Sequence, residues 1–598
     1  MNTCRALLNQ WCDTLLKLQV HNTENPFLDG GILCPACGRI HGRCFDAIYP
    51  LMYMADVTGN ETYLKGAQSL FDWAEAAVSR GNGSYVNDPG SSWAGTTVFS
   101  VIQLAESLEY HGHLLDESTR EKWKKRIAKA ADYLKDYQEF EVCNVNYRIT
   151  NSLAMELCGK VLGEESYRKR GQELKEMAVA CLTEQGLLVG EGRPVDGFSS
   201  KGCRPVDIGY NMEESLPSLV QYAYETDDEE LEILVSKALK YHLRFMLGDG
   251  AIDNSFGTRN YKWTYWGSRT SDGCLLGYLL AAEREPVFGV AAQKNLELLS
   301  SCTHGGILYA GPQMYQKGEL PCIHHTFTHA KVLAAILDHG LESRLADGKL
   351  PREQMRGMEY LKEADTYLIY RDGWTATVTG YDWEYKQLPG GHASGGTMTL
   401  LWHETAGPLV AAGMCEYSLK EPGNMQLPRF SHHESLVPRL EVTQNGKLYS
   451  NIYDRECRIW NLKPDQWQNG SMDTAESSGT ELLAEGILTD IGQQKLKENG
   501  SYQLHYVFSK NAVKVTGTCQ AADCWILPIV SQQAEKVAIE ENTVKFLKNG
   551  KIITISVERG KLELPYGTER IYQLVPGMEA VKIMILPENG EFAFCILF

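Results

Sequence analysis

The hydrophobic positions of the first 340 or so residues follow a helical period. Apolar side chains recur every three to four residues in about twelve segments, and short Gly- and Asn-containing turns separate neighbours, as at Thr58–Gly59–Asn60. Helices that come in neighbouring pairs without a strict sequence repeat predict stacked hairpins in a closed or nearly closed toroid. The predicted helices cover 2–19, 44–57, 61–80, 93–111, 116–138, 147–162, 165–184, 212–225, 228–246, 269–283, 287–300 and 323–340.

From about residue 366 the period changes to two, which is typical of strands. Turn signals such as LKNGK and PENGE separate the alternating runs. We therefore predict an α+β multidomain chain: an N-terminal (α/α) toroid of about six helical hairpins, then a C-terminal antiparallel β-sandwich. The expected division is 1–345 for the catalytic toroid, 346–365 for a junction and 366–598 for the sandwich. The predicted strands are 366–371, 374–385, 397–403, 501–509, 512–519, 551–558 and 592–598.

Charge and composition narrow the classes of partner. The 598 residues include 58 Lys and Arg against 76 Asp and Glu, a net charge of −18, so the field of the chain disfavours nucleic acid. The 12 Trp and 30 Tyr suit stacking on sugars as well as ordinary packing. The 17 Cys are scattered rather than arranged as a small disulfide scaffold.

The N-terminal segment is amphipathic and lacks the basic and apolar regions of a signal peptide. No run approaches the roughly 18 apolar residues of a membrane span. We therefore expect a cytoplasmic protein with no membrane partner, while an exported form with a longer N-terminus stays open. The sequence leaves the oligomeric state open as well.

One segment has the spacing of a metal site. Cys34, Cys37, His41 and Cys44 follow one another within CPACGRIHGRC, which resembles a zinc knuckle. A tetrahedral zinc site needs four thiolate or imidazole ligands, and the CPxCG turn brings two thiolates together. A structural zinc is one interpretation. The alternative is a loop whose His41 and Arg43 face a functional site.

Three polar, aromatic stretches are candidates for chemistry. In NVNYRITNSLAMELCG (144–159), Asn151 would donate a hydrogen bond to a substrate carboxylate beside Tyr147 and Arg148; the alternative is helix capping by Thr150 or Asn151. The second stretch is a glycine-rich loop, 193–210, that leads to Tyr210. In the third, 256–274, aromatic side chains alternate with arginines, which suits a sugar platform with a carboxylate clamp or else a core cluster. Its candidates are Arg259, Trp263, Trp266 and Arg269.

Histidines add to these stretches. His325 and His329 stand at i, i+4 on one predicted helix face, but the Glu of the metalloprotease pattern is missing. His392 lies in a Gly-rich turn before a predicted strand. Each is a candidate for the same site.

These motifs resemble those of the heparinase II/III-type polysaccharide lyases, and among them the lyases that remove rhamnose from glucuronate. Asn151 is similar to the family's carboxylate-neutralising Asn, and the loop from Asp196–Gly197 to Tyr210 is similar to the one bearing its catalytic Tyr. Gly391–His392 is similar to a family turn whose His reaches the cleft. Ser394 and Gly396 replace the later residues of the family's His-x-His-x-Asp form, so the histidine role also falls to His325, His329 or His41.

The resemblance implies β-elimination on an oligo- or polysaccharide that contains a 4-linked uronic acid. Tyr210 would act as base and then acid, while Asn151, with Arg259 or Arg269, neutralises the carboxylate. Such a reaction requires no redox cofactor or metal.

Two alternatives stay open. A glycoside hydrolase on the same toroid would use two carboxylates about 5–9.5 Å apart across a sugar. Its candidates are Asp88, Asp196, Asp207 and Glu214. A non-catalytic binder would use the Trp263–Trp266 platform and show saturable binding without turnover.

Overall fold

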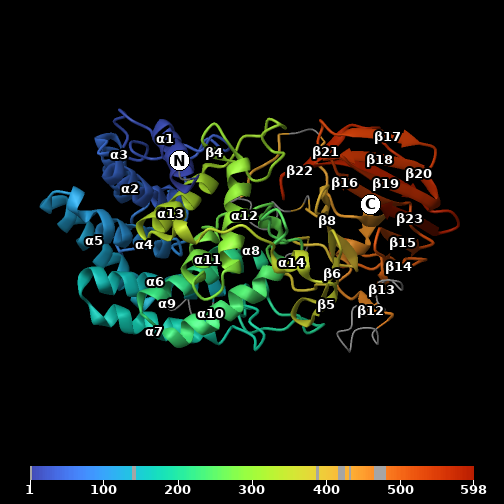
Figure 1. Cartoon of the computed structure of the whole chain (residues 1–598), viewed down its shortest axis with the longest axis horizontal. Helices are drawn as coiled ribbons and strands as arrows, with labels where there is room; N and C mark the ends of the chain where they lie inside the picture. Colours follow the sequence, from blue (N-terminus) through green and yellow to red (C-terminus); the bar gives the residue numbers. More distant parts are fainter. Residues whose placement is uncertain are drawn as a thin grey trace. The chain divides into compact units, whose positions relative to one another are not determined.

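The computed structural model describes residues 3–137, 143–385, 390–414, 416, 425–429, 432–463 and 480–598. It divides into two compact units, which we call the helical unit and the β unit. In Figure 1 the helical unit carries the helices coloured blue to yellow, and the β unit carries the yellow to red strands. The helical unit comprises the described residues up to Asp196, with Gly209–Arg244 and Trp266–Gly348; the β unit comprises Gly197–Ile208, Phe245–Tyr265 and the described residues from Lys349 onward.

Six helices of the helical unit form a closed inner ring. Each contacts the next in chain order, and α13 contacts α2, which closes the ring. A second set of helices packs outside them, so the predicted toroid of helical hairpins is confirmed. The inner helices are α2 (Ile48–Thr58), α4 (Thr97–His111), α6 (Val145–Leu162), α9 (Leu216–Glu225), α11 (Leu275–Ala281) and α13 (Ile323–Asp338). The outer helices are α1 (Thr3–Leu18), α3 (Glu61–Ala77), α5 (Glu117–Asp136), α7 (Glu165–Val179), α10 (Glu229–His242) and α12 (Val287–Ser301).

The two rings differ in sequence for a physical reason. Helices α4 and α13 are buried along most of their length and are rich in small and apolar residues. Helices α5 and α7 have charged outer faces and bury only one stripe. The predicted turn at Thr58–Gly59–Asn60 is confirmed: Gly59 ends α2 with φ +65°, and the Asn60 side chain caps α3 by accepting from the Thr62 N–H.

Two boundaries near the polar stretches differ from the prediction. Helix α6 begins at Val145, two residues early, and its N-cap residue is Asn144, so neither Thr150 nor Asn151 is a helix cap. The predicted helix 269–283 begins only at Leu275. The reason is local, since Thr270 and Gly273 adopt φ +62° and +115° and cannot continue a right-handed helix.

The β unit consists of antiparallel sheets around a shared apolar core, which confirms the predicted sandwich class. The predicted junction contains α14 (Pro351–Gln354) and β5 (Gly357–Leu361), and β5 pairs with β6. One five-stranded sheet has the order β5–β6–β7–β8–β9, with β6 (Thr366–Arg371), β7 (Trp374–Thr379), β8 (Thr397–His403) and β9 (Gly407–Ala411).

Two larger sheets complete the described part of this unit. A six-stranded sheet contains β10 (Arg439–Gln444), β11 (Lys447–Ser450), β16 (Cys524–Val530), β20 (Lys561–Glu563), β21 (Arg570–Gln573) and β22 (Met578–Leu586). An eight-stranded sheet contains β12 (Arg458–Asn461), β13 (Thr480–Ile487), β14 (Ser501–Phe508), β15 (Ala512–Thr518), β17 (Lys536–Glu540), β18 (Thr543–Lys548), β19 (Lys551–Arg559) and β23 (Glu591–Leu597). Across the described residues, each helix is too short or too polar to span a bilayer.

Candidate active site

Tyr210 lies inside the helical unit on an irregular stretch of backbone. It ends the short helix α8 (Ile208–Tyr210), and the next five residues form a π-helical turn before α9. Its hydroxyl hydrogen-bonds Thr270 Oγ1 at 2.7 Å and donates to the Arg269 carbonyl at 3.4 Å. Thr270 is a β-branched residue at φ +62°, a conformation that persists only where the surroundings impose it. Two unusual backbone segments therefore hold this phenol in place.

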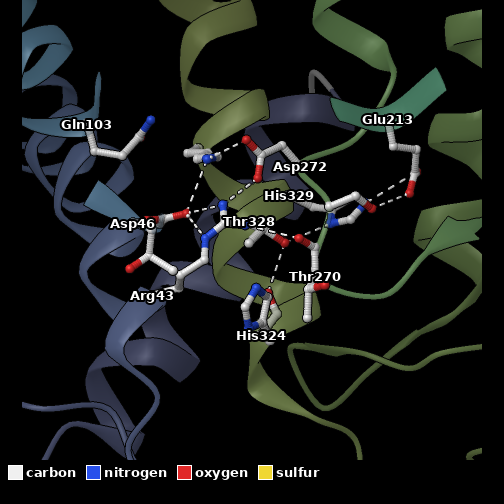
Figure 2. Close-up of polar contacts among 12 residues, drawn as sticks. Arg43, Asp46, Gln103, Glu213, Thr270, Asp272, His324, Thr328 and His329 are labelled. Carbon is white, nitrogen blue, oxygen red and sulfur yellow. Dashed lines mark hydrogen bonds and ion pairs between the residues drawn. The ribbon is translucent and has the colours of Figure 1, made fainter. Parts of the chain in front are cut away.

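A buried ion cluster continues from Thr270, as Figure 2 shows. The Arg43 guanidinium donates to the Thr270 carbonyl at 3.0 Å and pairs with Asp46 at 2.5 Å and Asp272 at 2.6 Å. Lys331 on α13 pairs with the same two carboxylates, at 3.1 and 2.7 Å. Two cations thus balance two carboxylates. Breaking one pair would leave a buried charge uncompensated, so the cluster fixes the wall beside Tyr210.

The predicted histidine pair lies on the same helix, where both rings pack edge-on against Trp266. His329 Nδ1 lies 2.9 Å from the His325 carbonyl oxygen, and because a carbonyl only accepts, Nδ1 carries a proton. The other ring nitrogen, Nε2, faces Glu213 Oε1 at 3.7 Å. His325 is buried, and neither ring nitrogen has a hydrogen-bond partner among the described residues. Burial, with the charge of Arg269 next, holds the pKa of His325 well below its usual range, which makes this ring neutral.

Glu213 is a residue that the sequence analysis missed. Its carboxylate accepts from the Ser268 N–H at 2.6 Å and from the Ser271 hydroxyl at 2.8 Å. A Cβ on Gly267 would lie 2.0 Å from the Glu213 carboxyl carbon, so only glycine permits this contact. The carboxylate thereby holds the loop that leads to Thr270 and faces His329.

Glu106 and Glu214 line a small internal cavity of about 40 Å³ together with Asp272 and Lys331. Burial raises the pKa of Glu106 to about 7. The hydrogen bond that the Gln221 amide donates to this carboxyl acts in the opposite direction. Burial and the nearby Asp272 carboxylate raise the pKa of Glu214 well above its ordinary value. Burial therefore disfavours the charged form of both carboxyls.

Glu106 makes stability depend on pH in a defined direction. Because its pKa is higher in the folded chain, the folded state binds more protons than the unfolded state between about pH 4.5 and 7. The free energy of unfolding contributed by this group therefore falls as pH rises through that window. We expect Glu106→Gln to remove this decline, measured by urea unfolding at a series of pH values. Glu173→Gln, at a half-exposed position, is the control; parallel profiles for Glu106→Gln and the unmodified chain would contradict the assignment.

Two asparagines of α6 lie in different surroundings. Asn151, the predicted carboxylate-neutralising residue, is buried and its side-chain amide donates to the Leu134 carbonyl at 3.4 Å. Asn146, which the sequence analysis did not select, is in the first turn of α6; it is buried, and its Oδ1 has no partner among the described residues. The sequence feature that could have indicated Asn146 is its position near the N-terminus of a helix. That position can be recognised only when the helix is known to begin at Val145.

A short segment joins the start of α6 to the Tyr210 region. The Val145 N–H donates to the Gly190 carbonyl and the Asn146 N–H donates to Glu191 Oε1 at 3.1 Å. Two residues before Gly190, the Leu188 carbonyl accepts from the Asn211 side chain at 2.8 Å. The residue after Tyr210 and the first turn of α6 are thus hydrogen-bonded to the same stretch of chain, 188–191.

Other predicted residues of the helical unit have structural partners. Tyr147 accepts from Trp93 Nε1 at 3.1 Å, and Arg148 donates to the Met177 carbonyl at 3.0 Å. Trp266 is fully buried and donates to the Tyr309 carbonyl, so its ring is not exposed as a sugar platform. Arg269 is buried and lies close enough to lower the pKa of His325. Their roles toward substrate stay predictions.

Three predicted residues belong to the β unit. Trp263 is fully buried and donates to the Ile252 carbonyl at 2.9 Å, so it is a core residue rather than half of an exposed platform. Arg259 is buried, with its guanidinium over the Tyr385 ring. His392 is buried, with Nε2 2.8 Å from the Trp383 carbonyl and Nδ1 3.2 Å from the Ala393 carbonyl. The substrate roles of Arg259 and His392 stay predictions.

The predicted zinc ligands are brought together in part. The ligand atoms of Cys34, Cys37 and His41 all lie within 4.8 Å of one another. Cys44 is buried in the 3₁₀ turn Gly42–Ala47 and does not join them. The thiol next to the group is instead that of Cys322, which directly precedes α13. The proposed fourth ligand Cys44 was therefore wrong.

Comparison with known proteins identifies the family. The family model described as the ulvan lyase N-terminal domain matches residues 8–354, and the ulvan lyase C-terminal domain matches residues 358–597. The chain belongs to the ulvan lyase family. Its relative in Formosa agariphila, a broad-specificity ulvan lyase, is 39% identical over 98% of this chain and 92% of that protein. The protein is a polysaccharide lyase, which overturns the hydrolase and non-catalytic alternatives.

Solved structures of other lyases share the fold of this chain. Heparinase III matches with a TM-score of 0.54 at 12% identity, covering 92% of this chain and 75% of that one. A chondroitin AC lyase from Streptomyces coelicolor A3 matches with a TM-score of 0.52 at 12% identity, covering 100% and 79%. The predicted resemblance to heparinase-type toroid lyases is confirmed.

The acidic residues of the hydrolase alternative have different surroundings. Asp88 faces His41 at 3.5 Å, Asp196 is exposed, and Glu214 is buried with a raised pKa. Asp207 belongs to the β unit.

Proposed function

We propose that this chain is an ulvan lyase that cleaves at a 4-linked uronic acid by β-elimination, with Tyr210 as the proton-transfer residue. The observation that carries the proposal is the Tyr210 hydroxyl, held by Thr270 at the end of a buried ion cluster inside the helical unit. The name of the 39% identical relative supports ulvan as the substrate. Ulvan replaces the narrower rhamnosyl-glucuronate of the sequence prediction.

The proposed reaction balances without water or cofactor. Tyr210, as phenolate, removes the C5 proton of the uronic acid, and the electron pair forms the C4=C5 double bond as the C4–O bond breaks. The proton on Tyr210 then passes to the leaving oxygen. A general acid–base residue of this kind contributes about 10²- to 10⁴-fold to the rate.

The uronate carboxylate needs a neutralising partner, because charge moves onto it as the C5 proton leaves. We propose that the Asn146 amide is one partner and that Arg269 supplies a positive charge. His325 is buried and its pKa is lowered, and neither ring nitrogen has a hydrogen-bond partner among the described residues. These groups lie on α6, on the 266–273 loop and on α13; α6 contacts the π-helical turn that follows Tyr210, which supports a shared site.

The first test is absorbance in the near ultraviolet during incubation of the purified enzyme with ulvan, with mass spectrometry of the products. We expect a rising signal of the conjugated alkene and products with no added water. Heparan sulfate, chondroitin sulfate and a rhamnosyl-glucuronate oligosaccharide are tested in parallel to define the substrate. Products heavier by one water without alkene absorbance would contradict β-elimination, and turnover of the other polymers but not of ulvan would contradict the substrate.

A further inference from the structure

We propose that Cys34, Cys37, His41 and Cys322 bind one structural zinc ion, which joins the loop before α2 to the start of α13. The proposal concerns a different site from the one assigned to the reaction and does not depend on the proposed function. Three of the ligands follow one another closely in the sequence. The fourth comes from 288 residues further along the chain.

Three of the distances between ligand atoms are close to those of a tetrahedral site. Zinc–sulfur bonds of about 2.3 Å and zinc–nitrogen bonds of about 2.0–2.1 Å place ligand atoms roughly 3.5–3.8 Å apart. Cys37 Sγ lies 3.3 Å from His41 Nε2. Cys322 Sγ lies 3.9 Å from Cys34 Sγ and 3.9 Å from His41 Nε2. Cys322 Sγ is not within 4.8 Å of all three other ligand atoms, so its side chain must move toward Cys37 when the ion binds.

The ligand set and its support also fit zinc. Three thiolates with one imidazole are characteristic of structural zinc, whereas calcium and magnesium prefer oxygen ligands. His41 directs Nε2 toward the sulfurs, and its Nδ1 lies 3.5 Å from Asp88 Oδ1. A carboxylate behind a ligating histidine orients the ring and fixes the protonated nitrogen. Asp88, which lines no other described site, has that role here.

The backbone of the loop already places the cysteine ligands close together without a bound ion. The Gly38 N–H donates to the Cys34 carbonyl, and the Cys34 N–H donates to the Arg39 carbonyl, so the chain turns sharply between Cys34 and Arg39. Gly38 adopts φ +66° and a Cβ there would meet no atom within 4 Å, so its conformation rather than space requires glycine. The turn aims Cys34 and Cys37 to one side.

The site lies at the seam of the helical ring. Helix α13 is the last inner helix and contacts α2, the first, and α1; Figure 1 places the label of α13 beside those of α1 and α2. Cys322 precedes α13 directly, and the same helix then carries His325, His329 and Lys331. A zinc ion would therefore close the seam covalently and fix the start of the helix that bears the candidate site.

Metal analysis of the full-length enzyme, expressed with zinc and dialysed, tests the proposal. We expect about one zinc per chain, a loss of at least tenfold in bound zinc for Cys322→Ala, and full zinc for Cys44→Ala as the matched control. Asp88→Asn should weaken zinc binding by about 10- to 100-fold, as for other outer partners of ligating histidines. Chelation of the unmodified enzyme should lower its thermal unfolding midpoint.

Cobalt replacement keeps the test decisive if a cysteine variant fails to fold. The unmodified chain reconstituted with Co²⁺ should show intense visible bands and thiolate-to-metal charge transfer, the spectrum of a tetrahedral thiolate site. A weak octahedral spectrum, a zinc content far below one per chain, or zinc lost from Cys44→Ala but kept by Cys322→Ala would overturn the proposal. A Cys34–Cys322 disulfide in the purified enzyme would overturn it as well.

Discussion

Tyr210→Phe is expected to lower kcat by about 10²- to 10⁴-fold on ulvan while leaving KM within a few fold. The phenyl ring keeps the packing but removes the only atom that can exchange a proton with C5 in the proposed reaction. The lost hydrogen bond to Thr270 should cost only about 1 kcal/mol of stability. The measurement is initial alkene formation at saturating ulvan, with thermal unfolding of both proteins.

Tyr278→Phe provides the control for this substitution. Tyr278 is buried on α11, packs against Phe288, and its hydroxyl has no hydrogen-bond partner among the described residues. Removing that hydroxyl should leave activity unchanged and stability equal or slightly higher. If Tyr210→Phe retains activity within tenfold of the unmodified enzyme, Tyr210 is not the proton-transfer residue and the histidines of α13 become the next candidates.

Regular structure was predictable from local sequence. The helical period located the helices of the ring, and the alternation of period two located β6 and β8 to the residue, because burial on one face imposes those spacings. The i, i+4 relation of His325 and His329 was predictable for the same reason. Both rings indeed meet Trp266 on one side of α13.

The sequence did not predict the irregular backbone segments or the contacts between residues far apart in the chain. Nothing local marks Thr270 as left-handed, since that conformation is imposed by contacts to Tyr210 and Arg43. Cys322 joins Cys34 only after the ring closes, and the nearer Cys44 was the natural choice from spacing alone. Interleaved aromatic residues indicated a platform at Trp263 and Trp266, yet full burial shows that residue type does not reveal exposure.

The candidate active site also depends on two acidic residues whose sequence pattern is that of an ordinary helix. Glu213 and Glu214 lie three and four residues after Tyr210, and their pattern is typical of the start of an amphipathic helix. The π-helical turn instead buries both, and Gly267 allows one of them to approach the opposite loop. Such effects arise from packing between segments about 55 residues apart, which a periodicity analysis does not include.

Asn146→Ala is expected to lower kcat/KM by about 10²- to 10³-fold, because the amide is the proposed donor to the uronate carboxylate as charge develops. Its Oδ1 has no partner among the described residues, so the loss of stability should be small. Asn146→Asp has the same shape but places a negative charge against the substrate carboxylate, and should be less active than Asn146→Ala.

Asn151→Ala separates the two asparagines of α6. Its amide donates to the Leu134 carbonyl at the end of α5, so its loss should destabilise the α5–α6 contact by about 1–3 kcal/mol with little change in kcat/KM at a temperature where the variant is folded. Steady-state kinetics and urea unfolding of the three variants make the comparison. The opposite result, an inactive and stable Asn151→Ala beside an active Asn146→Ala, would restore the carboxylate role to Asn151. The Oδ1 atoms of both asparagines lack a partner among the described residues, so the comparison depends on the amide nitrogen. That of Asn151 already donates to the Leu134 carbonyl, and this difference favours Asn146 as the donor to substrate.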